Sequence, residues 1–380
     1  MAPHGTGACR CTHGGTGMSR TRLLMTADAV GGVWQYATDL AAALQPLGYE
    51  TILAVLGPAP TSAQRQEAER IAGVTVRHVP VEVDWLASGP DEIAAGRAML
   101  GQLARELRVD LVQINSPAFI GCGTFNVPTI GVMHSCVGTW WDAMEGSALP
   151  SDFLWRTRMI AEGLGNADAI VAPSRAFAEA VQRHYRLLRQ PHVVHNGRTA
   201  VLAAPRAMHD CAITIGRLWD AAKNVRVLDA AAAKLAIPFK AIGAVTGPNS
   251  ETVTLEHLHM IGQRDNQAVA ECLAARPIFV SAARYEPFGL AVLEAAQAGC
   301  ALVLSNIPTF RELWEGVATF VDPQDAQGFA DAIEAIVGDI PRRREAGKRA
   351  RKRASRYTAQ AMARGMDTIY RSLMQQKAAA

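Results

Sequence analysis

The sequence predicts an α/β protein made of two doubly wound, Rossmann-like parallel sheets, one in each half of the chain. Short β-rich runs alternate with Ala-rich helical stretches throughout the 380 residues, and this alternation is typical of βαβ units with helices on both faces of a sheet. It stops at one polar segment, residues 195–210, and restarts after it. A chain of this length also exceeds one ordinary hydrophobic core. We therefore expect two domains that face a central cleft.

The first domain is expected to span residues 19–200. Each of its strands is a short apolar run that a glycine or polar turn joins to a helical stretch, such as residues 32–48 or 174–185. The expected strands are residues 22–27, 50–57, 74–80, 109–115, 128–134 and 169–174. Residues 1–18 lack the apolar stretch of a signal peptide, so we expect a disordered tail with Met18 as an alternative start.

The second domain is expected to span residues 201–356 and repeats the pattern of the first. Its expected strands are residues 211–217, 239–244, 258–262, 277–282, 301–306 and 318–322. Near its end, residues 341–356 carry nine basic residues and one acid. A solvated helix face explains this run, and the alternative is a peripheral contact of residues 342–356 with an anionic membrane.

Composition narrows the class of protein. Apolar residues make up 49% and charged residues 19%, as in globular chains, and a net charge of +3 gives no argument for a nucleic-acid partner. Seven cysteines, mostly scattered through apolar stretches, favour a reducing, cytoplasmic compartment. The tract Cys9-Arg-Cys11-Thr-His13 has no second ligand pair, so we predict no metal there. No apolar run is long enough to span a bilayer.

Ligands of open parallel sheets bind outside the carboxyl ends of the strands, which makes the residues at those ends candidate site residues. Gly31 and Gly32 follow the first strand and open a helix, so their backbone N–H groups could face a phosphate. A tight turn that needs glycine explains them equally well. The G-x-G-x-x-G spacing is missing, which disfavours an NAD-dependent oxidoreductase.

His134 sits directly after a buried run, where a histidine is expected to face the cleft. Trp140 and Trp141 follow it and could form a stacking wall for a sugar ring, or pack in the core. In the second half, Arg217 ends a strand and Lys223 lies near the start of a helix. Two such cations suit a diphosphate, and a solvated surface is the alternative.

Two glutamates, Glu286 and Glu294, flank the segment Pro287-Phe288-Gly289-Leu290. With Pro287 in a first helical turn, the N–H groups of Phe288, Gly289 and Leu290 could point at an anion. The glutamates would then lie at most about 12 Å apart along a helix axis, which suits two sugars on either side of a diphosphate. A helix-dipole role would account for Glu286 alone. Gly262 ends another strand, and by position its backbone could read a nucleobase edge.

These residues resemble the retaining glycosyltransferases of family 4, which have the GT-B fold. The resemblance runs from about residue 21 to residue 372. Its most specific part is the E-x7-E element EPFGLAVLE, supported in order by GGV, MH, VAPS, HNG and GRLWDAAKN. It implies an acceptor-side first domain, a donor-binding second domain, and a C-terminal helix, residues 357–376, that crosses back to the first domain.

The resemblance also implies the roles of the candidate residues. Arg217 and Lys223 would hold the diphosphate of a nucleotide sugar, Glu286 its hexose and Glu294 its ribose. Gly31 and Gly32 would lie near donor and acceptor, and His134 at the reacting centre. The sequence has no D-x-D, which fits a site where cations and a helix terminus replace a metal, so no cofactor is expected. Two departures are HSCVG, without an early acidic residue, and SNIPTFREL, without a glycine pair.

The expected activity is retaining transfer of a hexose from UDP- or GDP-hexose to a hydroxyl acceptor, either a sugar or a lipid-linked glycan. Such a reaction would serve cell-surface polysaccharide or glycolipid synthesis in the cytoplasm, or at the inner face of the membrane. The alternatives are a nucleotide-sugar epimerase or sugar phosphorylase of the same fold, and a non-catalytic subunit that binds a nucleotide sugar.

Overall fold

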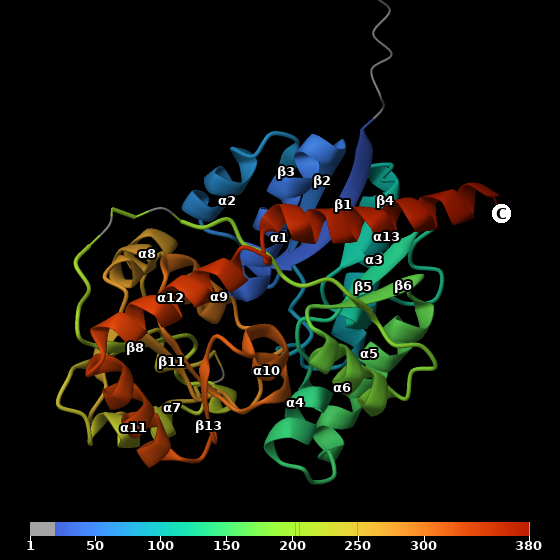
Figure 1. Cartoon of the computed structure of the whole chain (residues 1–380). Helices are drawn as coiled ribbons and strands as arrows, with labels where there is room; N and C mark the ends of the chain where they lie inside the picture. Colours follow the sequence, from blue (N-terminus) through green and yellow to red (C-terminus); the bar gives the residue numbers. More distant parts are fainter. Residues whose placement is uncertain (1–19, 202, 205, 249, 380) are drawn as a thin grey trace, which may run out of the picture.

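The computed structural model describes residues 20–201, 203–204, 206–248 and 250–379, and the expected tail at residues 1–18 lies outside them. Two parallel sheets follow one another along the chain (Figure 1). The first has the strand order β3-β2-β1-β4-β5-β6-β7 and the second β10-β9-β8-β11-β12-β13. When β7 is left out, both sheets have the strand order 3-2-1-4-5-6 of a doubly wound nucleotide-binding sheet. In such a sheet the order reverses beside the first strand. The predicted α/β fold is confirmed.

The first sheet contains β1 (Thr21–Asp28), β2 (Tyr49–Leu56), β3 (Val74–His78), β4 (Leu111–Ile114), β5 (Thr129–Val132), β6 (Ala169–Ala172) and β7 (His192–Val193). Its helices are α1 (Gly32–Leu44), η1 (Gln45–Leu47), α2 (Ser62–Glu69), α3 (Pro90–Glu106), η2 (Pro117–Phe119), α4 (Val137–Met144), α5 (Ser151–Asn166) and α6 (Arg175–Tyr185). All six strands expected here are present. The two-residue strand β7 was not predicted, because it is too short to show a period.

The second sheet contains β8 (Ala212–Ile215), β9 (Phe239–Ile242), β10 (His259–Gly262), β11 (Ile278–Ser281), β12 (Leu302–Ser305) and β13 (Thr319–Val321), again with every predicted strand present. Its helices are η3 (Ala221–Lys223), α7 (Val225–Ala232), α8 (Asn266–Ala274), α9 (Leu290–Ala298), α10 (Pro308–Trp314), α11 (Ala326–Val337) and α12 (Ile340–Ala354). The last helix is α13 (Ala359–Ala379). No helix in the described part of the chain is long and apolar enough to cross a membrane.

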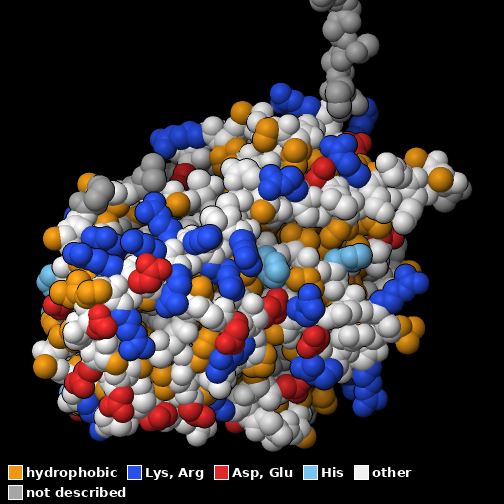
Figure 2. Space-filling view, in the orientation of Figure 1, with side chains coloured by type: hydrophobic (Ala, Val, Ile, Leu, Met, Phe, Trp, Pro, Cys, Tyr) orange, Lys and Arg blue, Asp and Glu red, His pale blue; other side chains and the backbone are white. Residues whose placement is uncertain are grey.

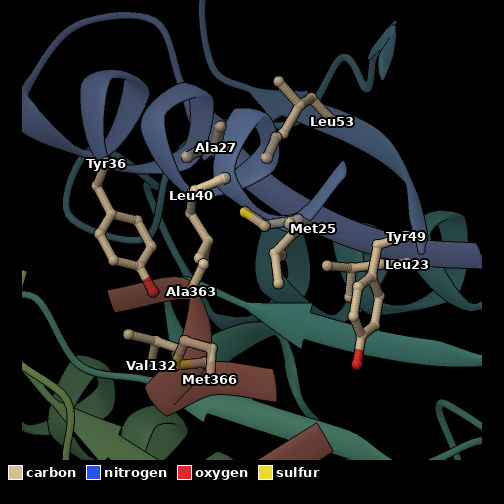
Figure 3. Packing of buried hydrophobic residues seen from close by; sticks show 14 of the residues in the cluster. Leu23, Met25, Ala27, Tyr36, Leu40, Tyr49, Leu53, Val132, Ala363 and Met366 are labelled. Carbon is tan, nitrogen blue, oxygen red and sulfur yellow. The ribbon is translucent and has the colours of Figure 1, made fainter. Parts of the chain in front are cut away.

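The C-terminal helix completes the core of the first domain. Met362, Ala363, Met366 and Tyr370 of α13 are buried together with the apolar face of β1 and α1. Figure 3 shows Ala363 and Met366 beneath the side chains of α1. The chain therefore crosses between the domains twice, once in each direction.

The two crossings touch at Gly197. A Cβ atom there would lie only 2.0 Å from the carbonyl oxygen of Thr358, so a close backbone approach requires glycine. The backbone N–H of the next residue, Arg198, donates to the carbonyl oxygen of Tyr357 at 3.2 Å. This contact brings the segment that contains Arg198 against the start of α13, next to both domains.

Candidate functional site

The candidate site forms where the first turn of α1 meets the second domain. A Cβ atom on Gly31 would lie 4.0 Å from Arg217 Nη1, and one on Gly32 would lie 3.4 Å from Leu290 Cδ1 at the start of α9. The glycine pair, the arginine after β8 and the N-terminus of α9 are thus brought together. The Gly31 N–H is not free, since it donates to Asp28 Oδ1 at 3.0 Å.

Lys223 lies inside this region and pairs with the first glutamate of the E-x7-E element. Its Nζ donates to Glu286 Oε2 at 2.5 Å, and both side chains are mostly buried. Lys223 belongs to η3, one residue before the left-handed Asn224, whose side-chain amide donates to the carbonyl oxygen of Ala282 at 3.0 Å. Arg217 is half exposed and pairs with Asp220 at 3.0 Å. One half-exposed cation and one mostly buried cation, each paired with a carboxylate, therefore lie in this region.

The segment around Glu286 differs from the prediction in one respect. The helix begins at Leu290 and not at Pro287, because Gly289 caps it in the left-handed conformation at φ 91°. Phe288 is buried against Tyr357, so only its backbone can face a ligand. The predicted placement of Pro287 in a first helical turn is wrong, and the helical spacing of about 12 Å between the glutamates does not apply.

Glu294 lies in the middle of α9 and contacts Arg198, a residue that was not predicted as part of the site. Arg198 Nη1 meets Glu294 Oε1, and the arginine side chain is buried. Gly262 ends β10 at the edge of the second sheet with φ 78°, and no neighbouring atom would lie within 4 Å of a Cβ added there. Space beside Gly262 is therefore open to a ligand.

His134 is held in one tautomer by the residues behind it. Asn115 Nδ2 donates to the carbonyl oxygen of Thr26 at 2.5 Å, which orients the amide and leaves Oδ1 as an acceptor. His134 Nε2 lies 3.1 Å from this oxygen and therefore carries the proton. The imidazole packs edge-on against Tyr36 at 4.4 Å. Its Nδ1 remains available to accept a hydrogen bond from a hydroxyl.

Burial lowers the pKa of His134 to about 4 from the ordinary value of 6.5. Below pH 6.5 the unfolded chain binds a proton that the folded protein rejects, so this residue lowers stability as the pH falls toward 4. A shift of 2.5 pKa units corresponds to about 3 kcal/mol, and we expect about 2 kcal/mol because the ring is partly exposed to solvent. At neutral pH the imidazole is uncharged.

We therefore expect the stability difference between the wild type and His134→Gln to depend on pH. Glutamine can still donate to Asn115 but does not titrate. Urea unfolding should show the wild type losing about 2 kcal/mol more than the variant between pH 6.5 and 4. Groups that titrate in both proteins cancel in this comparison. Parallel curves for the two proteins would contradict a depressed pKa of His134.

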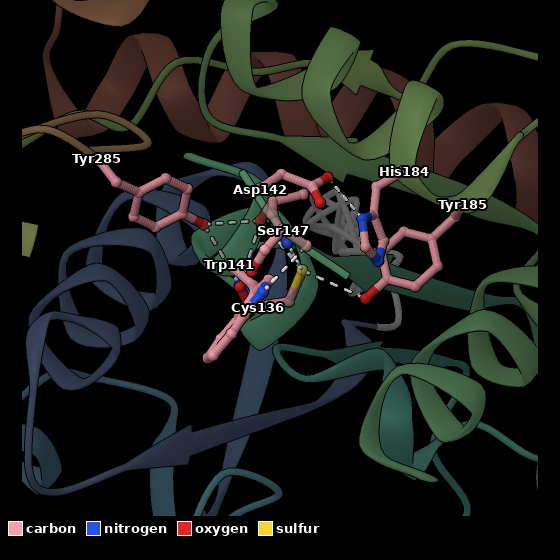
Figure 4. A network of polar contacts seen from close by, with 8 residues as sticks. Cys136, Trp141, Asp142, Ser147, His184, Tyr185 and Tyr285 are labelled. Carbon is pink, nitrogen blue, oxygen red and sulfur yellow. Dashed lines mark hydrogen bonds and ion pairs between the residues drawn. The ribbon is translucent and has the colours of Figure 1, made fainter. Parts of the chain in front are cut away.

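Helix α4, which follows His134, is held at both ends by residues that precede Glu286. The Tyr285 hydroxyl lies 2.9 Å from Thr139 Oγ1 and accepts from the Cys136 N–H at 3.4 Å, and Figure 4 shows this network. Arg284 Nη2 donates to the carbonyl oxygen of Met144 at 2.7 Å. The segment that precedes Glu286 and α4 are therefore positioned together, although neither Arg284 nor Tyr285 was predicted.

The two tryptophans of α4 are both partly exposed. Their ring centroids lie 6.2 Å apart, and Trp141 also packs against Phe153 at 5.7 Å. Trp141 Nε1 donates to the carbonyl oxygen of Ser147 at 3.2 Å. The segment between α4 and α5 therefore holds that ring. Among the described residues no group of three or more His, Cys, Asp or Glu side chains could hold a metal ion.

Both halves of the chain match the sequence profiles of known protein families. Residues 30–199 match the profile of Glycosyltransferase Family 4, and residues 249–353 match Glycosyl transferases group 1. The chain is 24% identical to a phosphatidyl-myo-inositol mannosyltransferase of Mycolicibacterium smegmatis over 359 residues, 87% of each chain.

Solved structures share the fold over more than nine tenths of the chain. Sucrose-phosphate synthase from Thermosynechococcus elongatus superposes with a TM-score of 0.76 at 19% identity, over 95% of this chain and 100% of that one. Anabaena HepE, solved in complex with UDP and glucose, superposes with a TM-score of 0.72 at 16% identity, over 93% and 100% of the two chains. With both family profiles matched in order and two parallel-sheet domains in place, the chain belongs to glycosyltransferase family 4 and has the GT-B fold.

Proposed function

We propose that this glycosyltransferase moves a hexose from UDP- or GDP-hexose to a hydroxyl acceptor with retention at the anomeric carbon, and without a metal. The observation that carries the proposal is the meeting of Lys223, Arg217 and the N-terminus of α9 beside Gly31 and Gly32. The leaving group of such a donor is a nucleoside diphosphate, and fixed cations with backbone N–H groups stabilise its developing charge.

We propose the following roles for the remaining residues. Glu286, held by Lys223, would accept hydroxyl hydrogen bonds from the hexose, and Glu294 would do so from the ribose. The backbone N–H groups of Phe288, Gly289 and Leu290 would face the diphosphate, and Gly262 the nucleobase. His134, uncharged at neutral pH, would accept a hydroxyl hydrogen bond at Nδ1.

Retention follows if the acceptor oxygen attacks on the face that the diphosphate leaves. The C1–O bond to the phosphate breaks, the acceptor oxygen bonds to C1, and the acceptor proton passes to the departing phosphate oxygen. In this reaction neither Glu286 nor Glu294 acts as a nucleophile. The mannosyltransferase relative and the complex of HepE with UDP and glucose support a nucleotide-sugar donor and an acceptor of the sugar or lipid-linked class.

A thermal-shift panel tests the donor class. UDP, GDP and ADP, each alone and as the hexose conjugate, are added to the full chain in the presence of EDTA. A ligand at 100 times its dissociation constant stabilises the fold by about 2.7 kcal/mol, so one nucleotide should raise the melting temperature clearly. NMR of the product then reports the anomeric configuration. An inverted product, an isomerised donor or a requirement for phosphate would overturn the proposed reaction.

Helix α12 supports a peripheral contact with an anionic membrane. Its buried face is formed by Arg343, Gly347, Ala350 and Ala354. The outward face carries one exposed acid, Glu345, and six exposed basic residues, Arg342, Arg344, Lys348, Arg349, Arg351 and Lys352, and a seventh, Arg356, follows two residues after the helix. Figure 2 shows Lys and Arg side chains gathered over this helix. About 1 kcal/mol per basic residue is available at an acidic bilayer.

We therefore expect that replacing Lys348, Arg349, Arg351 and Lys352 together by glutamine abolishes binding to anionic vesicles. Binding is measured by co-sedimentation at low salt with vesicles that contain roughly one third phosphatidylserine. These side chains are exposed, so the fold should be unaffected. Pure phosphatidylcholine vesicles are the control. Equal binding by the wild type and the variant would contradict this surface.

A further inference from the structure

A buried arginine ties the second glutamate of the E-x7-E element to the first domain. Arg198 lies in the segment between the domains, and only 6% of its side chain is exposed. Its Nη1 contacts Glu294 Oε1 on α9, and its Nε lies 3.6 Å from Asp39 Oδ2 on α1. One guanidinium therefore lies between a carboxylate of each domain. We call this arrangement of Asp39, Arg198 and Glu294 the charge bridge.

Polar side chains on both sides hold the charge bridge in place. Asp39 Oδ2 accepts from Gln35 Nε2 at 3.1 Å, and Gln35 Oε1 accepts from Asn266 Nδ2, at the start of α8, at 2.8 Å. On the other side, Gln297 Nε2 of α9 donates to the backbone oxygen of Arg198 at 3.0 Å. The first domain and the second are thus joined twice here, once through the charge bridge and once through Gln35 and Asn266.

The two ends of the charge bridge differ in strength. Desolvation lowers the pKa of Arg198 and raises that of Asp39, and in each case the opposite charge counteracts the shift. Arg198 Nε is buried and has no hydrogen-bond partner within the described part of the chain. The contact with Asp39 is therefore electrostatic only, while the contact with Glu294 is direct. A buried arginine without either carboxylate would be strongly unfavourable.

The second oxygen of Glu294 can serve a ligand while the first stays on the charge bridge. Beside the charge bridge, Arg198 and Glu294 line a cavity of only about 40 Å³ together with Asn266 and Gln297, which is too small to hold a ribose itself. A carboxylate has two oxygens, so Glu294 can accept a ligand hydroxyl at Oε2 while Oε1 stays on Arg198. Without the guanidinium, the carboxylates of Asp39 and Glu294 would both lose the positive charge that lies between them.

We infer that Arg198 is a positioning residue for the donor ribose: its contact orients the Glu294 carboxylate, and through Asp39 it couples occupation of the donor site to the first domain. The inference rests on the proposed donor site. It assigns a role to a residue between the domains that touches the ligand only through Glu294.

Calorimetric titration of the full chain with UDP and with GDP tests this role. Arg198→Met is expected to weaken binding of the nucleotide that the wild type prefers at least tenfold. Arg198→Lys should weaken it less, because lysine keeps the charge but loses the second contact. Arg206→Met is the matched control, since Arg206 lies in the same segment but is exposed in its pair with Glu271, and it should bind as the wild type does.

A second set of variants keeps the test decisive if Arg198→Met does not fold. Asp39→Asn should weaken nucleotide binding about threefold in the wild type and have no further effect in Glu294→Gln, where the charge bridge has lost its other end. Wild-type affinity in a folded Arg198→Met, or the same effect of Asp39→Asn in both backgrounds, would overturn the coupling. If the wild type binds neither nucleotide, the proposed donor site itself fails, and the inference fails with it.

Discussion

Replacing Lys223 by methionine is expected to lower kcat/KM for sugar transfer roughly hundred- to thousandfold, the usual effect of removing one preorganised group that stabilises a developing negative charge. Lys223 is mostly buried, and its ammonium group lies 2.5 Å from Glu286. In the free protein the two charges satisfy each other. In the proposed reaction, the same ammonium would stabilise the diphosphate while Glu286 would turn to the hexose hydroxyls. Methionine keeps the length of the side chain and loses the charge.

The variant also leaves Glu286 buried without its partner, so part of the loss would come from a misplaced carboxylate. The double variant Lys223→Met, Glu286→Gln removes the unpaired carboxylate: it should fold as stably as the wild type and remain at least as inactive as the single variant, since Glu286 is itself proposed to hold the hexose. Lys234→Met is the matched control, since Lys234 is exposed and lies two residues after α7. The kcat/KM of each of these proteins is obtained from initial rates over a range of donor concentrations. Recovery of activity in the double variant would contradict a direct role for Lys223.

The strands could be predicted from the sequence because both sheets are parallel and buried on both faces. The centres of expected strands, such as residues 52–56 and 301–304, are apolar throughout, and only a strand covered on both faces or a buried helix tolerates such a run. The start of α9 was predicted three residues too early. Proline at 287 suggested a first helical turn, whereas the positive φ of Gly289 places the helix start at Leu290.

The candidate site could be predicted only in part, for a physical reason. Residues at the ends of strands, such as His134 and Arg217, are placed by local sequence, because the sheet order fixes which end faces the cleft. Arg198 is placed by a contact between domains. Nothing in the sequence distinguishes Arg198 from Arg206. In the structure, however, Arg198 is buried and Arg206 is exposed. Tyr285 was missed for the same reason, since its partners lie in α4 of the other domain.

A large loss of stability is also expected when a buried network of hydrogen bonds is broken. This network links the C-terminal helix to His134. The hydroxyl of Tyr370 on α13 donates to Gln113 Oε1 in β4. Gln113 Nε2 lies 2.9 Å from Asn115 Oδ1, the oxygen that also accepts from His134, and 3.2 Å from the Tyr36 hydroxyl. Gln113 and Tyr370 are fully buried, so every partner in this network has to come from the protein.

Gln113→Leu is therefore expected to destabilise the protein by about 3 kcal/mol, since two phenol hydroxyls, those of Tyr36 and Tyr370, lose a partner in the core at roughly 1–3 kcal/mol each. Leucine has nearly the same volume, so a cavity contributes little. Urea unfolding, monitored by tryptophan fluorescence, measures the change.

The decisive comparison is the triple variant Gln113→Leu, Tyr36→Phe, Tyr370→Phe. Replacing all partners of a buried hydrogen bond by apolar groups of the same shape is far less costly than removing one of them. The triple variant should thus be more stable than Gln113→Leu alone, although it carries more substitutions. If instead each substitution adds its own loss, the cost comes from packing and not from unsatisfied hydroxyls. Because Asn115 keeps its bonds to Thr26 and His134 in every variant, the histidine should retain its tautomer, and the pH dependence of stability that it causes should persist.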